Sequence, residues 1–125
     1  MLGMMITQKL RRRLPDEFGI AVAYFSLISS LNSLALTERE LQLMAFTAVR
    51  GNMSLGNVKT EFCERFSTTF PTISNIVYKL KKQGLLIKED GRVKVNKMFP
   101  SNFKDGITLN VILEINESNA KEGNN

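Results

Sequence analysis

The chain has 125 residues, of which 43% are hydrophobic and 23% charged, the balance of a globular domain with a single core. One cysteine and no histidine exclude an internal disulfide framework and the usual Cys/His zinc site, and they remove the commonest general base. The 17 Lys and Arg residues exceed the 12 Asp and Glu residues, and the net charge of +5 favours an anionic partner.

The same features argue against an enzyme and against a membrane protein. Six of the 12 acidic residues form three pairs that look like helix-surface or turn residues: Glu38/Glu40, Glu61/Glu64 and Glu89/Asp90. We therefore expect no catalytic residues, no cofactor and no metal. No apolar run reaches about 18 residues, so we expect no membrane span. In MLGMMITQKLRRRLP the charges follow the apolar residues, the reverse of a signal peptide, and we expect a cytoplasmic protein, or one of the host cytoplasm or the virion if it is viral.

Residues 1–36 combine a basic arm with an apolar extension. The cluster Lys9, Arg11, Arg12 and Arg13 is either an arm that follows phosphates or a solvated terminus. Around this cluster, the apolar residues Ile6, Leu10 and Leu14 have helical spacing, which allows a short helix ending before Pro15.

The apolar stretch at residues 19–28 fits either a strand or a helix, because a short run of this kind does not distinguish the two periods. We predict a strand at 19–23, then a helix to about Leu31 and a loop at Asn32-Ser33.

Residues 37–51 carry the strongest helix signal of the chain. Thr37 and Glu40 have the spacing of a capping box, and Leu36 can form a hydrophobic staple with Leu41. One face is apolar over the whole segment, at Leu41, Met44, Ala45 and Ala48. Gly51-Asn52 is a typical helix end.

Two further helices and a hairpin follow. Val58, Phe62 and Phe66 recur every four residues, which predicts a helix within 54–66. After the break at 67–71, a helix at 71–83 buries a stripe of Ile73, Ile76, Val77 and Leu80 and ends at Gly84. Asp90-Gly91 predicts a two-residue turn in a hairpin at 86–96, with one apolar and one basic face.

The rest of the chain is predicted to contain a loop, a strand and a polar tail. In the region 97–115, the residues 98–106 form the loop, and the alternation of apolar residues over 107–115, with Ile112 as the one exception on the polar side, predicts a half-buried strand. That strand can pair with residues 19–23 or with another subunit. Residues 116–125 are polar and are expected to be disordered.

Residues 37–96 resemble the winged helix-turn-helix domains of bacterial, archaeal and phage regulators. The match lies in the helix spacing, in Cys63 at a close helix crossing, in the buried Ile73 and Leu80, and in the exit at Gly84-Leu85-Leu86. The turn departs from the family, with Ser67 in place of the frequent Gly and Thr68 in place of an apolar residue. The resemblance implies a mainly α fold with a small β component, extended by the N-terminal segment and the C-terminal strand, as in small phage-encoded members.

The resemblance also implies a site, in which the third helix of the motif enters the major groove of double-stranded DNA and the hairpin contacts backbone. The implied positions near base edges or phosphate are Thr69, Thr72, Ser74, Asn75 and Tyr78. The implied phosphate contacts are Lys79, Lys82, Arg92 and Lys94. Asn75 is either an adenine reader or solvated, and Tyr78 either meets DNA or covers the hairpin. Phe70 and Cys63 are expected to pack in the core.

Two functions remain open. The first is a DNA-binding transcription regulator, working as a homo-oligomer. The second is a structural or assembly module of a viral particle or of a replication or packaging complex, with a protein partner bound through the N-terminal segment and the C-terminal strand.

Overall fold

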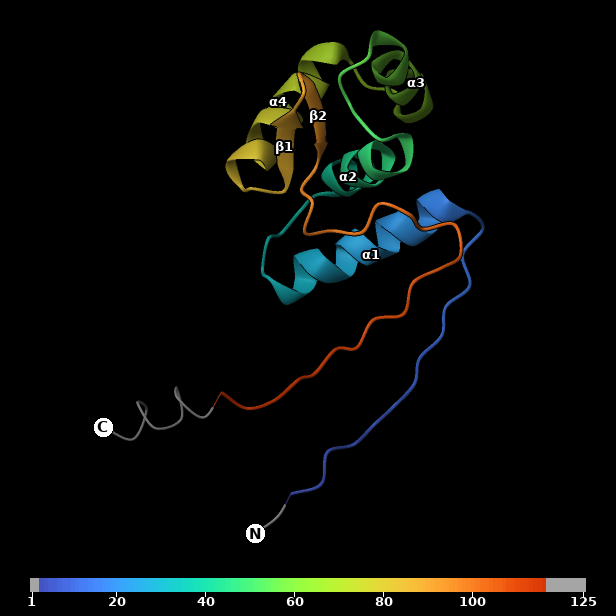
Figure 1. Cartoon of the computed structure of the whole chain (residues 1–125), viewed down its shortest axis with the longest axis vertical. Coiled ribbons are helices and arrows are strands. Elements are labelled where there is room, and N and C mark those ends of the chain that lie inside the picture. Colours follow the sequence, from blue (N-terminus) through green and yellow to red (C-terminus); the bar gives the residue numbers. More distant parts are fainter. Residues whose placement is uncertain (1–2, 117–125) are drawn as a thin grey trace, which may run out of the picture.

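The computed structural model describes residues 3–116 and shows a mainly helical protein with one small antiparallel sheet, in agreement with the predicted class (Figure 1). The element order is α1 (Glu17–Leu31), α2 (Glu38–Arg50), α3 (Gly56–Phe66), α4 (Phe70–Lys82), β1 (Leu86–Glu89) and β2 (Arg92–Val95). The helices α2, α3 and α4 gather with the hairpin at one end of the molecule, and α1 lies against α2 below them.

Helix α2 lies at the centre of the core. Its capping box is formed as predicted: the Thr37 N–H donates to Glu40 Oε1 at 2.8 Å, and the Glu40 N–H donates to Thr37 Oγ1 at 3.2 Å. The helix ends at Gly51, which has a left-handed φ of 91° and whose N–H donates to the Thr47 carbonyl. Six consecutive residues of α2, 43–48, are buried, so this helix packs on neighbours from several sides.

The predicted strand at residues 19–23 is wrong, because these residues belong to α1. Asp16 caps this helix by accepting a 2.8 Å hydrogen bond from the Gly19 N–H. Ala21, Tyr24 and Phe25 are buried in the same hydrophobic cluster as α2. A helix covered on more than one side needs apolar residues around most of its circumference, and that is why the run showed no clear period.

The segment between the hairpin and residue 106 runs across α1 (Figure 1). Phe103 is fully buried, with its ring centroid 5.6 Å from that of Tyr24, and Phe99 lies 5.6 Å from Phe25. This segment contains no helix or strand, but its aromatic side chains pack into the core.

The predicted helix–break–helix is present at α3 and α4. The Asn52 side chain accepts hydrogen bonds from the N–H groups of Ser54 and Leu55 and so leads the chain into α3. Ser67 ends α3 with a left-handed φ of 52°, the conformation for which the related turns often have Gly. The Arg39 guanidinium donates to the carbonyl of Phe66 and holds this turn against α2.

The hairpin forms with the predicted turn. Asp90 and Gly91 have φ values of 53° and 75°, as a type I′ turn requires, and Lys88 is paired with Val93. The outer edge of β2 is also bonded: the Met53 N–H donates to the Val93 carbonyl at 3.0 Å, and the Val93 N–H donates to Ser54 Oγ at 2.7 Å. The segment between α2 and α3 therefore fixes the hairpin to the helices.

Two predictions for the flanks are wrong within the described residues. Residues 3–14 form no helix, and Met4, Ile6 and Leu10 are exposed, because an isolated short helix with no surface to pack on is marginal. Residues 107–115 form no strand within this single chain and are exposed, because the expected partner at 19–23 is helical; their pairing with another subunit stays a prediction. The polar tail at 116–125 lies, beyond residue 116, outside the described residues.

We expect Phe103→Ala to lower the free energy of unfolding by about 3–5 kcal/mol, the usual cost of removing a buried aromatic ring. The control is Met98→Ala in the same segment, where the side chain is exposed and the loss should stay below about 0.5 kcal/mol. Urea unfolding followed by circular dichroism measures both. Equal small losses would mean that residues 96–106 are not part of the core.

Candidate nucleic-acid interface

Helix α4 is held at both ends and along one side. Thr69 Oγ1 accepts from the Thr72 N–H at 3.3 Å, and Pro71 stands in the first turn, where an N–H has no helical partner. At the other end Gly84 has a φ of 76°, and the Leu85 N–H donates to the Leu80 carbonyl at 3.0 Å. Between these ends Ile73 and Leu80 are buried, so the opposite side of α4 is free to face a partner.

The predicted contact residues on α4 do lie on that outer side. At 100° per residue, Asn75, Tyr78 and Lys82 point away from Ile73 and Leu80. All the α4 candidates and its cap are exposed, namely Thr69, Thr72, Ser74, Asn75, Tyr78, Lys79 and Lys82. Tyr78 is 65% exposed, and the Lys82 ammonium lies 5.4 Å from the centroid of its ring. This face offers hydroxyl, amide and ammonium groups side by side.

Lys79 has a second role that the sequence did not reveal. Its Nζ lies 2.7 Å from Glu40 Oε2, and the Glu40 side chain is only 7% exposed. Burial alone would raise the pKa of Glu40, but the hydrogen bonds from Lys79 and Thr37 together hold that pKa below its usual value. Lys79 therefore ties α4 to the start of α2, and its charge is partly compensated before any phosphate arrives.

Glu40 itself was expected on the helix surface, and that expectation is wrong. It completes the capping box with one oxygen and binds Lys79 with the other. The capping box was readable from the sequence, but the partner 39 positions away was not.

The cationic side chains of the hairpin differ in their exposure and in whether an acidic side chain lies beside them. Arg92 and Lys94 lie on one face of the ribbon, and Val93 and Val95 on the other, as predicted. Lys94 is half-buried and 3.5 Å from Glu89, whereas Arg92 is exposed. Lys97 lies 2.5 Å from Glu89, and this hydrogen bond is the main reason why the pKa of Glu89 is lowered. Within residues 3–116 Arg92 has no acidic partner, so it is the hairpin candidate best placed for phosphate.

Phe70 and Cys63, both expected in the core, differ in how deeply they are buried. Phe70, expected in the core, is 45% exposed at the first position of α4, because the Ile73 stripe and not Phe70 faces α2 and α3. Cys63 is half-buried beside the core, in line with a packing role. The exposed Phe70 adds an apolar edge to the candidate surface.

The basic arm carries the other cationic cluster. Lys9, Arg11, Arg12 and Arg13 are exposed in an extended segment that leaves the body at the start of α1 (Figure 1). No contact fixes these side chains to the helices in the part of the chain that the structure describes. They can follow a bound polyanion without any loss of internal contacts.

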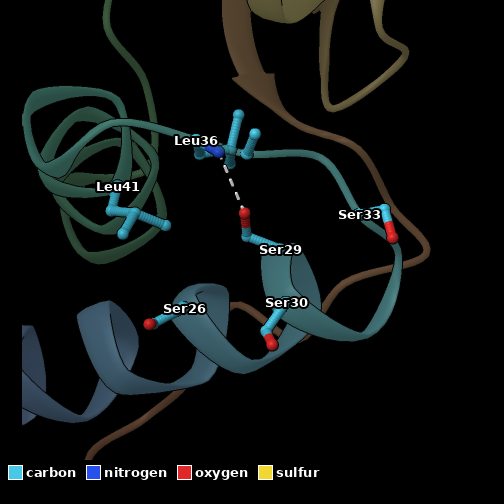
Figure 2. Close-up of a pocket in the computed structure, with 7 residues that line it drawn as sticks. Ser26, Ser29, Ser30, Ser33, Leu36 and Leu41 are labelled. Carbon is cyan, nitrogen blue, oxygen red and sulfur yellow. Dashed lines mark hydrogen bonds between the residues drawn. The ribbon is translucent and has the colours of Figure 1, made fainter.

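A separate hollow of about 400 Å³ lies between α1 and the loop into α2 (Figure 2). Its walls are formed by Ser26, Ser29, Ser30, Ser33, Ala35, Leu36 and Leu41. The Ser29 hydroxyl accepts a 3.0 Å hydrogen bond from the Leu36 N–H and so fixes the loop. The lining consists of Ser, Ala and Leu residues, none of which can act as the general base that a serine nucleophile needs. The hydrogen bond from Leu36 to Ser29 has a structural role, because it holds the loop against α1.

No protein-family model, curated protein or solved structure matches this chain. Among the helices of residues 3–116, none has the length and hydropathy that crossing a bilayer requires.

The Glu40 pair should make stability depend on pH. The folded-state pKa of Glu40 is lowered, so its contribution is complete above the unfolded value of about 4.3 and is lost as pH falls through the folded value. Glu40→Gln should cost on the order of 1 kcal/mol at neutral pH, because it weakens a hydrogen bond to a charged group. It should also make the free energy of unfolding fall less between about pH 6 and pH 3.

The matched control is Glu64→Gln, an exposed residue of α3 without an ion pair among the described residues. Its stability curve should run parallel to that of the unmodified protein. If Glu40→Gln gives the same parallel curve, the ion pair does not support the position of α4. Denaturant unfolding at a series of pH values measures all three curves.

Proposed function

We propose that this chain is a non-enzymatic, sequence-specific DNA-binding protein, a transcription regulator of the winged helix-turn-helix kind. In this proposal α4 enters the major groove and the β1–β2 hairpin contacts the backbone. The observation that carries it is the outer face of α4, where an amide, hydroxyls, a tyrosine and cations are all exposed on a helix fixed by its opposite side.

The order and attachment of the elements support the proposal. A capped helix, a shorter helix, a three-residue break and the candidate reader follow each other, and the hairpin comes directly after the reader. The backbone bond between Met53 and Val93 attaches the hairpin to the segment between the first two helices of this group. A hairpin held in this way keeps a constant position relative to α4, as a second contact to one duplex requires.

The distribution of charge supports the same partner. Lys81, Lys82, Lys88 and Arg92 are exposed on α4 and the hairpin, and none of them has an acidic partner within residues 3–116. Cations that are already compensated by the protein release few counterions on binding, whereas free ones release more. These four free cations lie on the two elements that the proposal assigns to DNA, and the exposed basic arm at residues 9–13 adds further free cations outside them.

Binding to duplex DNA should weaken linearly with the logarithm of salt concentration. Lys82→Ala and Arg92→Ala should each reduce the slope by about 0.9, the value for one lost phosphate contact. Fluorescence anisotropy at several salt concentrations measures the slopes. Lys104→Ala removes the same charge outside the site and should leave the slope unchanged.

Lys79→Ala should behave differently from these variants. It removes the partner of a buried carboxylate, so it should lower the stability of the protein and reduce the slope by less than Lys82→Ala does. The proposal fails if the unmodified protein shows no salt-dependent binding to any duplex, or if Lys104→Ala reduces the slope as much as Arg92→Ala.

Asn75 is proposed to read a base, since its amide can make a bidentate pair with adenine. Once a preferred site has been selected from random duplexes, Asn75→Ala should weaken binding to that site by about 1–3 kcal/mol and leave non-specific binding nearly unchanged. Ser74→Ala is the neighbouring control with a smaller expected effect. Equal loss on specific and non-specific DNA would mean that Asn75 is not a base reader.

A second candidate function is supported by a different observation, the exposed apolar residues of 107–115. An assembly module of a viral particle, or of a replication or packaging complex, would use such a segment to join subunits. Light scattering separates the two functions, because a regulator is expected as a small discrete species and a module as a large ring or as a complex formed only with another protein.

A further inference from the structure

Residues 107–115 form an extended segment whose backbone groups make no hydrogen bonds to other residues of 3–116. After the bond from the Gly106 N–H to the Phe103 carbonyl, no N–H or C=O group of 107–115 is paired within residues 3–116. The exposed fraction of the apolar side chains rises from 37% at Ile107 to 84% at Ile115. An extended chain with open backbone groups and an apolar side is a ready template for pairing with another strand.

The sequence of the apolar side is the same in both directions. Along the segment it reads Ile107, Leu109, Val111, Leu113 and Ile115, which is symmetric about Val111. When two copies run antiparallel with Val111 opposite Val111, Leu109 faces Leu113 and Ile107 faces Ile115. A two-fold interface needs a surface that is complementary to itself, and this reading symmetry provides it.

The other side of the segment, with Thr108, Asn110, Ile112 and Glu114, favours the antiparallel arrangement. Glu114 is the one ionisable residue of 107–115. In the antiparallel register it lies opposite Thr108, but in a parallel register it would lie opposite Glu114 of the second copy. Like charges directly opposite each other destabilise a sheet, so the antiparallel register is favoured.

We propose that residues 107–115 of two copies of this chain pair as an antiparallel two-stranded ribbon centred on Val111, forming a closed dimer. The alternation predicted from the sequence then describes a real strand whose partner is the second copy. Two-stranded ribbons need an apolar surface to cover them. The helix closest to the two terminal segments is α1, which has Leu27 and Leu31 exposed (Figure 1). The proposal does not depend on DNA binding, because the mass of the assembly and disulfide cross-linking between copies test the dimer directly.

The experiment tests the register with the full chain. Val111→Cys places two thiols on the axis, with Cα atoms about 4.5–5.5 Å apart, within reach of a disulfide. Leu113→Cys places its two thiols about 13 Å apart along the ribbon, beyond that reach, although Leu113 is the more exposed residue. Under mild oxidation Val111→Cys should form a covalent dimer and Leu113→Cys should not. A mixture of Leu109→Cys and Leu113→Cys should cross-link although neither does so alone.

The unmodified protein sets the baseline, because Cys63 is present in every sample. Analytical ultracentrifugation should show twice the chain mass for the unmodified protein. Val111→Lys should convert the dimer to a monomer, because it places two like charges opposite each other at the two-fold axis of the ribbon. The helical circular dichroism signal of this variant should be unchanged. A monomer at all concentrations, an assembly larger than a dimer, a dimer unaffected by Val111→Lys, or cross-linking of Leu113→Cys as fast as Val111→Cys would each overturn the proposal.

Discussion

The carboxylate of Glu40 connects the parts of this molecule that matter most for its proposed site. One oxygen closes the first turn of α2, and the other holds Lys79 of α4. A buried carboxylate is costly without partners, so α2 and α4 are stabilised in the one arrangement that provides them. The hairpin follows α4 directly and is fixed separately, by the hydrogen bond from Met53 to Val93.

Local signals in the sequence were sufficient for the elements of residues 37–96. The capping box, the Gly51 helix end and the Asp90-Gly91 turn each depend on residues a few positions apart, and the structure contains all three. The start of α1 had a signal of the same kind in Asp16, whose side chain caps it. The apolar run after it concealed that signal, since a helix packed on more than one side has no single apolar stripe.

The remaining errors concern partners far apart in the sequence or outside it. Exposure of the candidate contact residues on α4 was predictable, because Ile73 and Leu80 define the buried side and the helical period places the other positions, although Phe70 at the first position was wrongly expected in the core. The pairing of Lys79 with Glu40 joins two helices and leaves no local pattern. For residues 107–115 the alternation is genuine, but no partner for it exists among the described residues, and a pattern in one chain does not state which strand it pairs with.

The separation of roles on α4 has a consequence for how such a protein changes over time. Asn75 and Tyr78 contribute to neither the core nor the helix ends, so substitutions there are expected to leave folding largely intact. Lys79 and Ile73 lie on the same helix but are constrained by α2 and by the core. Natural variation can therefore alter the exposed face of α4 one residue at a time, while the architecture that presents it stays constant.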